Sequence, residues 1–175
     1  MAIPVSEAIN LLERTPKLLN TLLKGLPDHL VYGNEGPETW SPYDIVGHLI
    51  HGEYTDWIPR LKICLSDQDE KIFQPFDRFA QFEISKGKTL IDLLTEFEKI
   101  RLANIESLLA FNLTETDYNR TATHPALGNV LLGELLTTWV VHDLNHLHQL
   151  SRVISHQYKD EVGPWKAYLG VLPRD

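Results

Sequence analysis

Apolar residues recur at steps of three and four positions along four long stretches of the sequence. This spacing places them on one face of an α-helix, and no stretch of comparable length alternates apolar and polar residues as a half-buried strand does. The pattern therefore predicts an all-α protein with four long helices. Their approximate bounds are residues 6–24, 42–65, 90–111 and 130–156.

Residues that commonly begin and end helices stand at several of these bounds. Ser6 and Ser41 are predicted N-caps, and Pro42 suits the first position of the second helix because proline lacks an N–H. Gly25 follows the first helix, where glycine is the usual stop. Pro59 lies inside the second helix and should kink or break it.

Two long connections, residues 66–89 and 112–129, join the helices. Such connections indicate a four-helix bundle with long crossover loops rather than a simple up-down bundle. The first carries four phenylalanines, more than an ordinary solvated loop exposes. Near the end of the chain, Trp165 and Tyr168 suggest a short element docked onto the bundle. No linker divides the chain, so residues 1–175 are interpreted as one domain.

Composition and charge exclude several classes of partner. A chain of 175 residues with 43% apolar residues can form one compact core. The formal net charge of −8, without a cluster of Lys and Arg among aromatics, argues against nucleic acid and anionic membranes as partners. The longest apolar run is residues 108–111, whereas a membrane span needs about 20 apolar residues.

The expected location is the cytoplasm. The first residues lack the cationic start and apolar stretch of a secretory signal. Cys64 is the only cysteine, so no intrachain disulfide can form. The sequence leaves open whether the protein is a monomer or a homodimer.

The fourth predicted helix carries an unusual set of polar residues, WVVHDLNHLHQL at positions 139–150. His142 and His146 lie about 40° apart on the inward face of this helix. Two imidazoles one turn apart can direct their lone pairs at one point, as in metal half-sites. An isolated pair of this kind is more often two buried neutral histidines, so both interpretations stand. His148 lies on another face and is expected to be exposed.

A third ligand would have to come from the second helix, which offers His48 and His51. Both histidines lie to the side of the apolar face of this helix, so the helical periodicity does not decide which of them is the ligand. The small neighbours Gly47 and Gly52 favour His48 because they leave room for something other than protein. His51 is interpreted as a rim or surface residue.

Two segments resemble the DinB-like family, whose members are metal-binding four-helix bundles. The first is WSPYDIVGHL, with Trp40 eight residues before His48, and the second is HPALGNVLLGELLTTWVVHDLNHLHQLSRV with the VGPWKAYL that follows. The resemblance covers residues 40–172. It implies that the metal ligands are His48, His142 and His146, and it leaves His51 and His148 out of the ligand set.

Three imidazoles leave at least one position of a divalent ion open for water or substrate. Imidazole suits zinc, nickel, iron and copper, so the sequence does not identify the metal. The family includes thiol-dependent transferases and isomerases. The resemblance therefore implies a metal-dependent enzyme of this type, with a small-molecule substrate and a low-molecular-weight thiol.

Two other functions remain open. One is a non-catalytic, metal-binding, stress-related protein, which would have a closed site. The other is a metal-dependent hydrolase, which needs a carboxylate base near the bound water; the candidates are Glu53 and Asp143.

Other polar residues are predicted to surround the ion or contact the substrate. Gln149 could orient a ligand imidazole. Asn145 could reach the open position, and Asp143 is expected near the site or at the surface. Arg78 could anchor an anionic substrate beneath a lid of phenylalanines. The members of that lid would be Phe73, Phe76 and Phe79.

Overall fold

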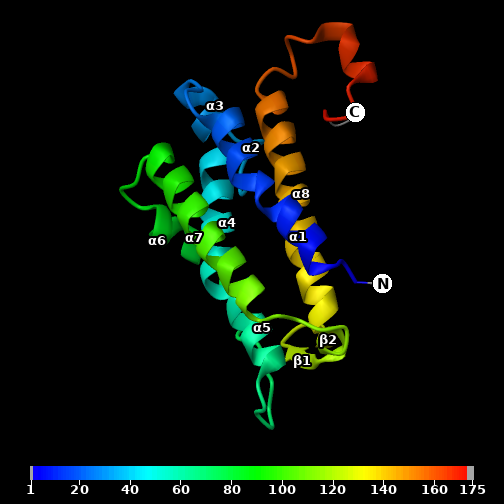
Figure 1. Cartoon of the computed structure of the whole chain (residues 1–175). Helices are drawn as coiled ribbons and strands as arrows, with labels where there is room; N and C mark the ends of the chain where they lie inside the picture. Colours follow the sequence, from blue (N-terminus) through cyan, green and yellow to red (C-terminus); the bar gives the residue numbers. More distant parts are fainter. Residues whose placement is uncertain (1, 173–175) are drawn as a thin grey trace.

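The computed structural model describes residues 2–172 and confirms a mainly helical bundle (Figure 1). Four helical units form it. The first is the pair α1 (Val5–Leu12) and α2 (Arg14–Leu23), the second is the pair α4 (Pro42–Thr55) and α5 (Trp57–Leu65), and the others are α7 (Leu90–Ala110) and α8 (Leu132–His156). Both long helices, α7 and α8, pack against α4, and the N-terminal pair contacts α7 and α8.

The first predicted helix is interrupted at Glu13, between α1 and α2. It begins at Val5 after Pro4, so the prediction of Ser6 as the N-cap is wrong. Gly25 lies just beyond α2 with φ +83°, a conformation that glycine adopts readily. The loop that follows contains a further short helix, α3 (Asp28–Tyr32).

The second predicted helix begins as expected but breaks earlier than its proline. Ser41 forms a capping box with Asp44, and Pro42 occupies the first turn. The break falls at Asp56, and Pro59 lies in the first turn of α5. A proline is tolerated there because the first N–H groups of a helix have no partner within it.

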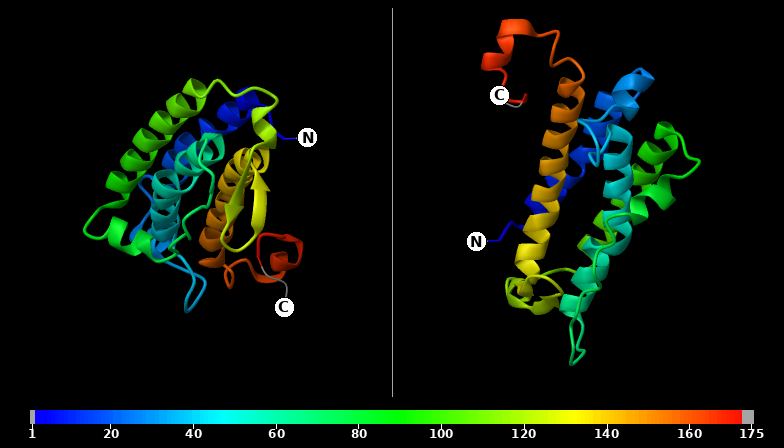
Figure 2. Two further views of the ribbon diagram at one scale, coloured as in Figure 1. Left: turned by 90° about the horizontal axis from the view of Figure 1, so that it is seen from below. Right: turned by 180° about the vertical axis from the view of Figure 1, so that it is seen from behind.

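Both long connections contain secondary structure. The first holds the short helix α6 (Ala80–Ser85), packed on α4. The second holds the 3-10 turn η1 (Asp117–Asn119) and an antiparallel hairpin of β1 (Thr121–His124) and β2 (Gly128–Leu131). The sequence pattern missed this hairpin because its strands are too short to show alternation. Figure 2 shows the hairpin beside the start of α8, at the end of the bundle where α5 lies.

The last described element is a 3-10 helix, η2 (Gly163–Tyr168). Trp165 and Tyr168 are 70% and 83% exposed, so the prediction that they dock onto the bundle is wrong. Figure 1 shows this segment projecting from the end of α8. None of the helices within residues 2–172 is long and apolar enough to span a membrane.

A polar layer divides the core into two apolar clusters. One cluster lies around α1, α5 and the first half of α8, and the other lies around α2, α4 and the last turns of α8. In the layer that separates the two clusters, each helical unit contributes one buried polar residue. These residues are Thr15, Glu53, Arg101 and Asp143. The predicted metal ligands lie at the same level of the bundle, because His142 and His146 flank this layer on α8.

Candidate metal centre

Three histidines converge from two helices. Nε2 of His142 lies 3.1 Å from Nε2 of His48 and 3.1 Å from Nε2 of His146. Within the part of the chain that the structure describes, these three residues form a group whose possible ligand atoms all lie within 4.8 Å of one another. The structure therefore brings together the three residues that the family resemblance implied as ligands.

This arrangement fits a divalent ion better than it fits a hydrogen-bonded cluster. A single Nε2 of His142 faces two other ring nitrogens, so it cannot form two well-directed bonds with its one lone pair or one N–H. Four-coordinate zinc with Zn–N bonds of about 2.0–2.1 Å places its ligand nitrogens roughly 3.3 Å apart. The observed separation is close to that value.

The surroundings keep these imidazoles neutral, as metal ligands must be. Burial, reinforced by the neighbouring imidazoles, lowers the pKa of His48 to about 3. Burial also lowers the pKa of His142 to about 3, with smaller contributions from His146 and Arg101. Burial lowers the pKa of His146 as well. A neutral imidazole offers a lone pair to an ion at neutral pH.

Gln149 fixes the orientation of one imidazole. Its Oε1 lies 2.8 Å from Nδ1 of His146. An amide oxygen can only accept, so Nδ1 of His146 donates and its Nε2 keeps the lone pair. Nδ1 of His48 and Nδ1 of His142 are buried without a hydrogen-bond partner among residues 2–172. Gln149 therefore occupies the place that the sequence analysis suggested for a residue supporting a ligand.

Aromatic side chains pack around the histidines. The ring of Trp40 lies 4.8 Å from that of His48, and the ring of Trp57 lies 5.0 Å from that of His142. Phe76 contacts His48 and also covers His51. The interpretation of His51 as a rim or surface residue is therefore wrong: a phenylalanine from the first long connection buries it.

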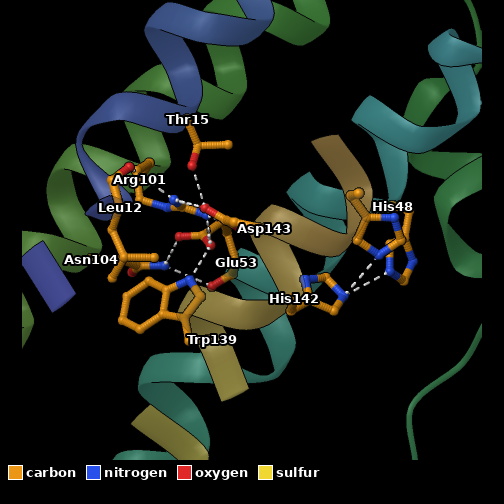
Figure 3. Close-up of polar contacts among 10 residues, drawn as sticks. Leu12, Thr15, His48, Glu53, Arg101, Asn104, Trp139, His142 and Asp143 are labelled. Carbon is orange, nitrogen blue, oxygen red and sulfur yellow. Dashed lines mark hydrogen bonds and ion pairs between the residues drawn. The ribbon is translucent and has the colours of Figure 1, made fainter. Parts of the chain in front are cut away.

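The two carboxylates suggested as a catalytic base lie on the far side of α8 from the imidazoles (Figure 3). Arg101 forms ion pairs with both, at 2.8 Å to Glu53. Trp139 donates to Glu53, and Thr15 donates to Asp143. Burial raises the pKa of Glu53, against the opposing effect of Arg101. Both carboxylates are thus committed to a buried ionic network.

A cavity of about 600 Å³ opens beside the three histidines, all of which line it. Arg78 lines the same cavity, but the expected lid above it is only partly formed: Phe73 is buried in the core and Phe79 is 73% exposed. Asn145 lines a different hollow along α8, together with His142. The exposed position of His148 agrees with the prediction.

Three further polar residues line this cavity and were not predicted from the sequence: Asp56, Arg60 and His124. The first two lie at the break between α4 and α5, and His124 lies on the hairpin. An i, i+4 spacing of Asp56 and Arg60 was the available signal for their ion pair, which measures 2.8 Å. Nothing in the periodicity indicated that the pair faces the histidines.

Residues 11–150 match the sequence model of the DinB superfamily. The chain belongs to the DinB superfamily. This confirms the resemblance on which the ligand assignment was based, over most of the length of the protein.

Two relatives of this DinB-superfamily protein are described as metal-dependent hydrolases. The protein OB0782 of Oceanobacillus iheyensis is 24% identical over 153 residues, which cover 84% of each chain. The structure of YfiT from Bacillus subtilis, described as having an unusual four-helix bundle topology, aligns with a TM-score of 0.69 at 21% identity. That alignment covers 91% of this chain and 87% of YfiT. Together with the three converging imidazoles, the relatives support a site for a divalent metal.

Proposed function

We propose that this DinB-superfamily protein is a metal-dependent hydrolase that acts on a small molecule. The observation that carries the proposal is that three neutral imidazoles converge in the wall of a cavity that opens to solvent. A structural metal site is closed by four protein ligands, whereas a catalytic site keeps a position free. The names of the two relatives support the same chemistry.

When bound, a divalent ion in such a site would supply a Lewis acid that lowers the pKa of water into the neutral range and polarises a carbonyl. Neither Glu53 nor Asp143 lines the cavity, so this lowered pKa would have to replace the carboxylate base that hydrolysis was expected to need. The protein's own residues prepare the site for the ion. His48, His142 and His146 present lone pairs, and Gln149 holds His146 in the required tautomer. Trp40 packs against the site and restricts its side chains.

Hydrolysis of small chromogenic esters, amides and lactones by the zinc-loaded protein tests the proposal. We expect turnover by the wild type and by His148→Ala, whose histidine is exposed. His142→Ala should lose turnover together with its metal. Absence of turnover across the panel by fully loaded wild type would contradict the proposal.

Thiol-dependent transfer is a second candidate, favoured by one observation. Neither Glu53 nor Asp143 lines the cavity, because Arg101 holds both of them on the other side of α8. A divalent ion held by the three imidazoles would lower the pKa of a bound thiol, which could then lose its proton to solvent without a carboxylate base. This route would use a low-molecular-weight thiol as the second substrate.

Cobalt-substituted protein distinguishes the two candidates. Addition of a low-molecular-weight thiol should produce an intense near-ultraviolet charge-transfer band if sulfur binds the ion. His48→Ala, checked for metal content, is the control. If no cellular thiol perturbs a fully loaded site, the transfer candidate is wrong and hydrolysis remains. The open cavity argues against the third alternative, a non-catalytic metal-binding stress protein.

A further inference from the structure

The cavity beside the three histidines has a second, charged end. Arg60 and Asp56 line it at the break between α4 and α5, and Arg78 and His124 line it from the connections. An α-helical rise of 1.5 Å per residue puts the Cα atoms of His48 and Asp56 about 12 Å apart along the helix axis. The charged end therefore lies further along the α4–α5 unit than His48 does.

Arg60 is held in place while part of its guanidinium stays available. Its Nη2 forms an ion pair with Asp56 at 2.8 Å and donates a long bond of 3.4 Å to the carbonyl of Gln74. The guanidinium carbon lies 5.3 Å from the centre of the Phe73 ring. The side chain is 9% exposed and lines the cavity, and neither Nε nor Nη1 has a hydrogen bond to any residue within 2–172. An immobilised guanidinium with free N–H groups is prepared to bind an acceptor.

The charge at this end of the cavity is positive. Arg60 and Arg78 contribute two cations, whereas Asp56 contributes one carboxylate. Burial raises the pKa of Asp56 to about 6 against the opposing effect of Arg60, and Asp56 still carries most of its negative charge at neutral pH. The whole protein carries a formal charge of −8, so this end of the cavity has the opposite sign to the chain as a whole.

We infer that Arg60 binds an anionic group of the substrate, a carboxylate or a phosphoryl group, while the reacting group lies at the three imidazoles. This inference rests on the proposed function, because it assigns the other end of the same substrate. Arg78, which is exposed at the rim, adds attraction without fixing the position of the anion. Asp56 orients Arg60 and competes with the substrate for it.

Binding of paired probes to the zinc-loaded protein tests the inference without an activity assay. Each probe is a hydroxamate, which binds the ion, joined by methylene chains of increasing length to a terminal carboxylate, phosphonate or neutral primary amide. Calorimetry should show that the wild type prefers an anionic tail over the amide tail by about tenfold at the best chain length. The tighter of the two anionic tails identifies the substrate's group.

Three variants assign that preference to Arg60. Arg60→Gln should bind both tails alike, with unchanged metal content. Arg152→Gln is the matched control, because Arg152 also forms an ion pair, with Glu35, and does not line the cavity. Asp56→Asn should increase the preference for the anionic tail, since it removes the competing carboxylate. If the Asp56–Arg60 ion pair had only a structural role, both substitutions would instead weaken the binding of the anionic and the amide probes equally.

The outcomes separate the inference from the function on which it rests. If both tails bind loaded wild type equally, the assignment of Arg60 is overturned while the metal centre stands. If neither probe binds the zinc-loaded wild type, the proposal of a metal site with an open position is contradicted, and the inference about Arg60 is contradicted with it. Should Arg60→Gln not fold, the direction of the Asp56→Asn effect still decides.

Discussion

His142 and Asp143 are adjacent in the chain, yet their side chains serve opposite sides of α8. His142 meets the imidazoles of His48 and His146, whereas Asp143 pairs with Arg101 in the buried layer (Figure 3). Successive residues on a helix lie 100° apart, so one turn can contribute to both groups. The ligand group and the ionic network are thereby held at one level of the bundle.

Loss of a ligand should abolish metal binding only at the predicted positions. His142→Ala removes the imidazole that contacts both of its partners, so bound metal measured by elemental analysis should fall to a small fraction of the wild-type content. His148→Ala should keep wild-type content because His148 is exposed outside the group. Equal metal content in the two variants would contradict the assignment.

Removing the support of a ligand should weaken metal binding without abolishing it. Gln149→Leu leaves Nδ1 of His146 without its acceptor, and we expect about tenfold lower affinity for zinc in a competition titration with a chelator. Gln157→Leu, on the residue just after α8, is the control because the hydrogen bonds of Gln157 within residues 2–172 go to backbone carbonyls alone. If both variants bind zinc as the wild type does, Gln149 has no part in the site.

Breaking the buried ionic network should cost far more stability than breaking a surface ion pair. Arg101→Met leaves the carboxylates of Glu53 and Asp143 buried without their cation, and we expect a loss of about 3–5 kcal/mol in the free energy of unfolding. Arg152→Met breaks a partly exposed pair and should cost about 1 kcal/mol or less. Urea unfolding of both variants measures the difference. Comparable losses would show that the network is not fully formed.

The depressed pKa values of the histidines predict how stability changes with pH in the metal-free protein. The folded pKa of His142 is about 3, below the unfolded value of about 6.5, so protons bind the unfolded chain first. Its contribution to stability is complete above pH 6.5 and is lost as pH falls toward 3. Between pH 5.5 and 4 the free energy of unfolding should fall less steeply in His142→Gln than in the wild type, by about 1.4 kcal/mol per pH unit. Parallel pH dependences would show that His142 is not held neutral.

The sequence predicted the helical bundle because each long helix carries a repeated apolar pattern. It also predicted the neighbourhood of His142 and His146, since a fixed helical spacing puts them on one face. The three-residue ligand set depended on the family resemblance, as periodicity alone left His48 and His51 as alternatives. The structure confirms that His48 lies beside the α8 pair.

Features created by long-range packing escaped the sequence analysis. His51 is buried because Phe76, from a connection without clear periodicity, folds over it. The hairpin has strands of four residues each, and β1 gains support from Phe73, whose N–H donates to the carbonyl of Thr123. Glu53 is held away from the three imidazoles by Arg101, which lies 48 residues further along the chain. A local sequence pattern does not predict contacts between residues so far apart in the chain.

The buried polar layer also fixes the axial register of the bundle. Apolar side chains of similar size can exchange places when one helix slides past another, but an ionic network cannot, because a shift would leave Arg101, Glu53 or Asp143 buried without a partner. The network thus selects one height of α8 relative to α4. Since His142 is the residue before Asp143, that choice also sets where its imidazole meets the one from His48. The precision with which the three imidazoles converge is therefore decided by side chains on the opposite side of α8.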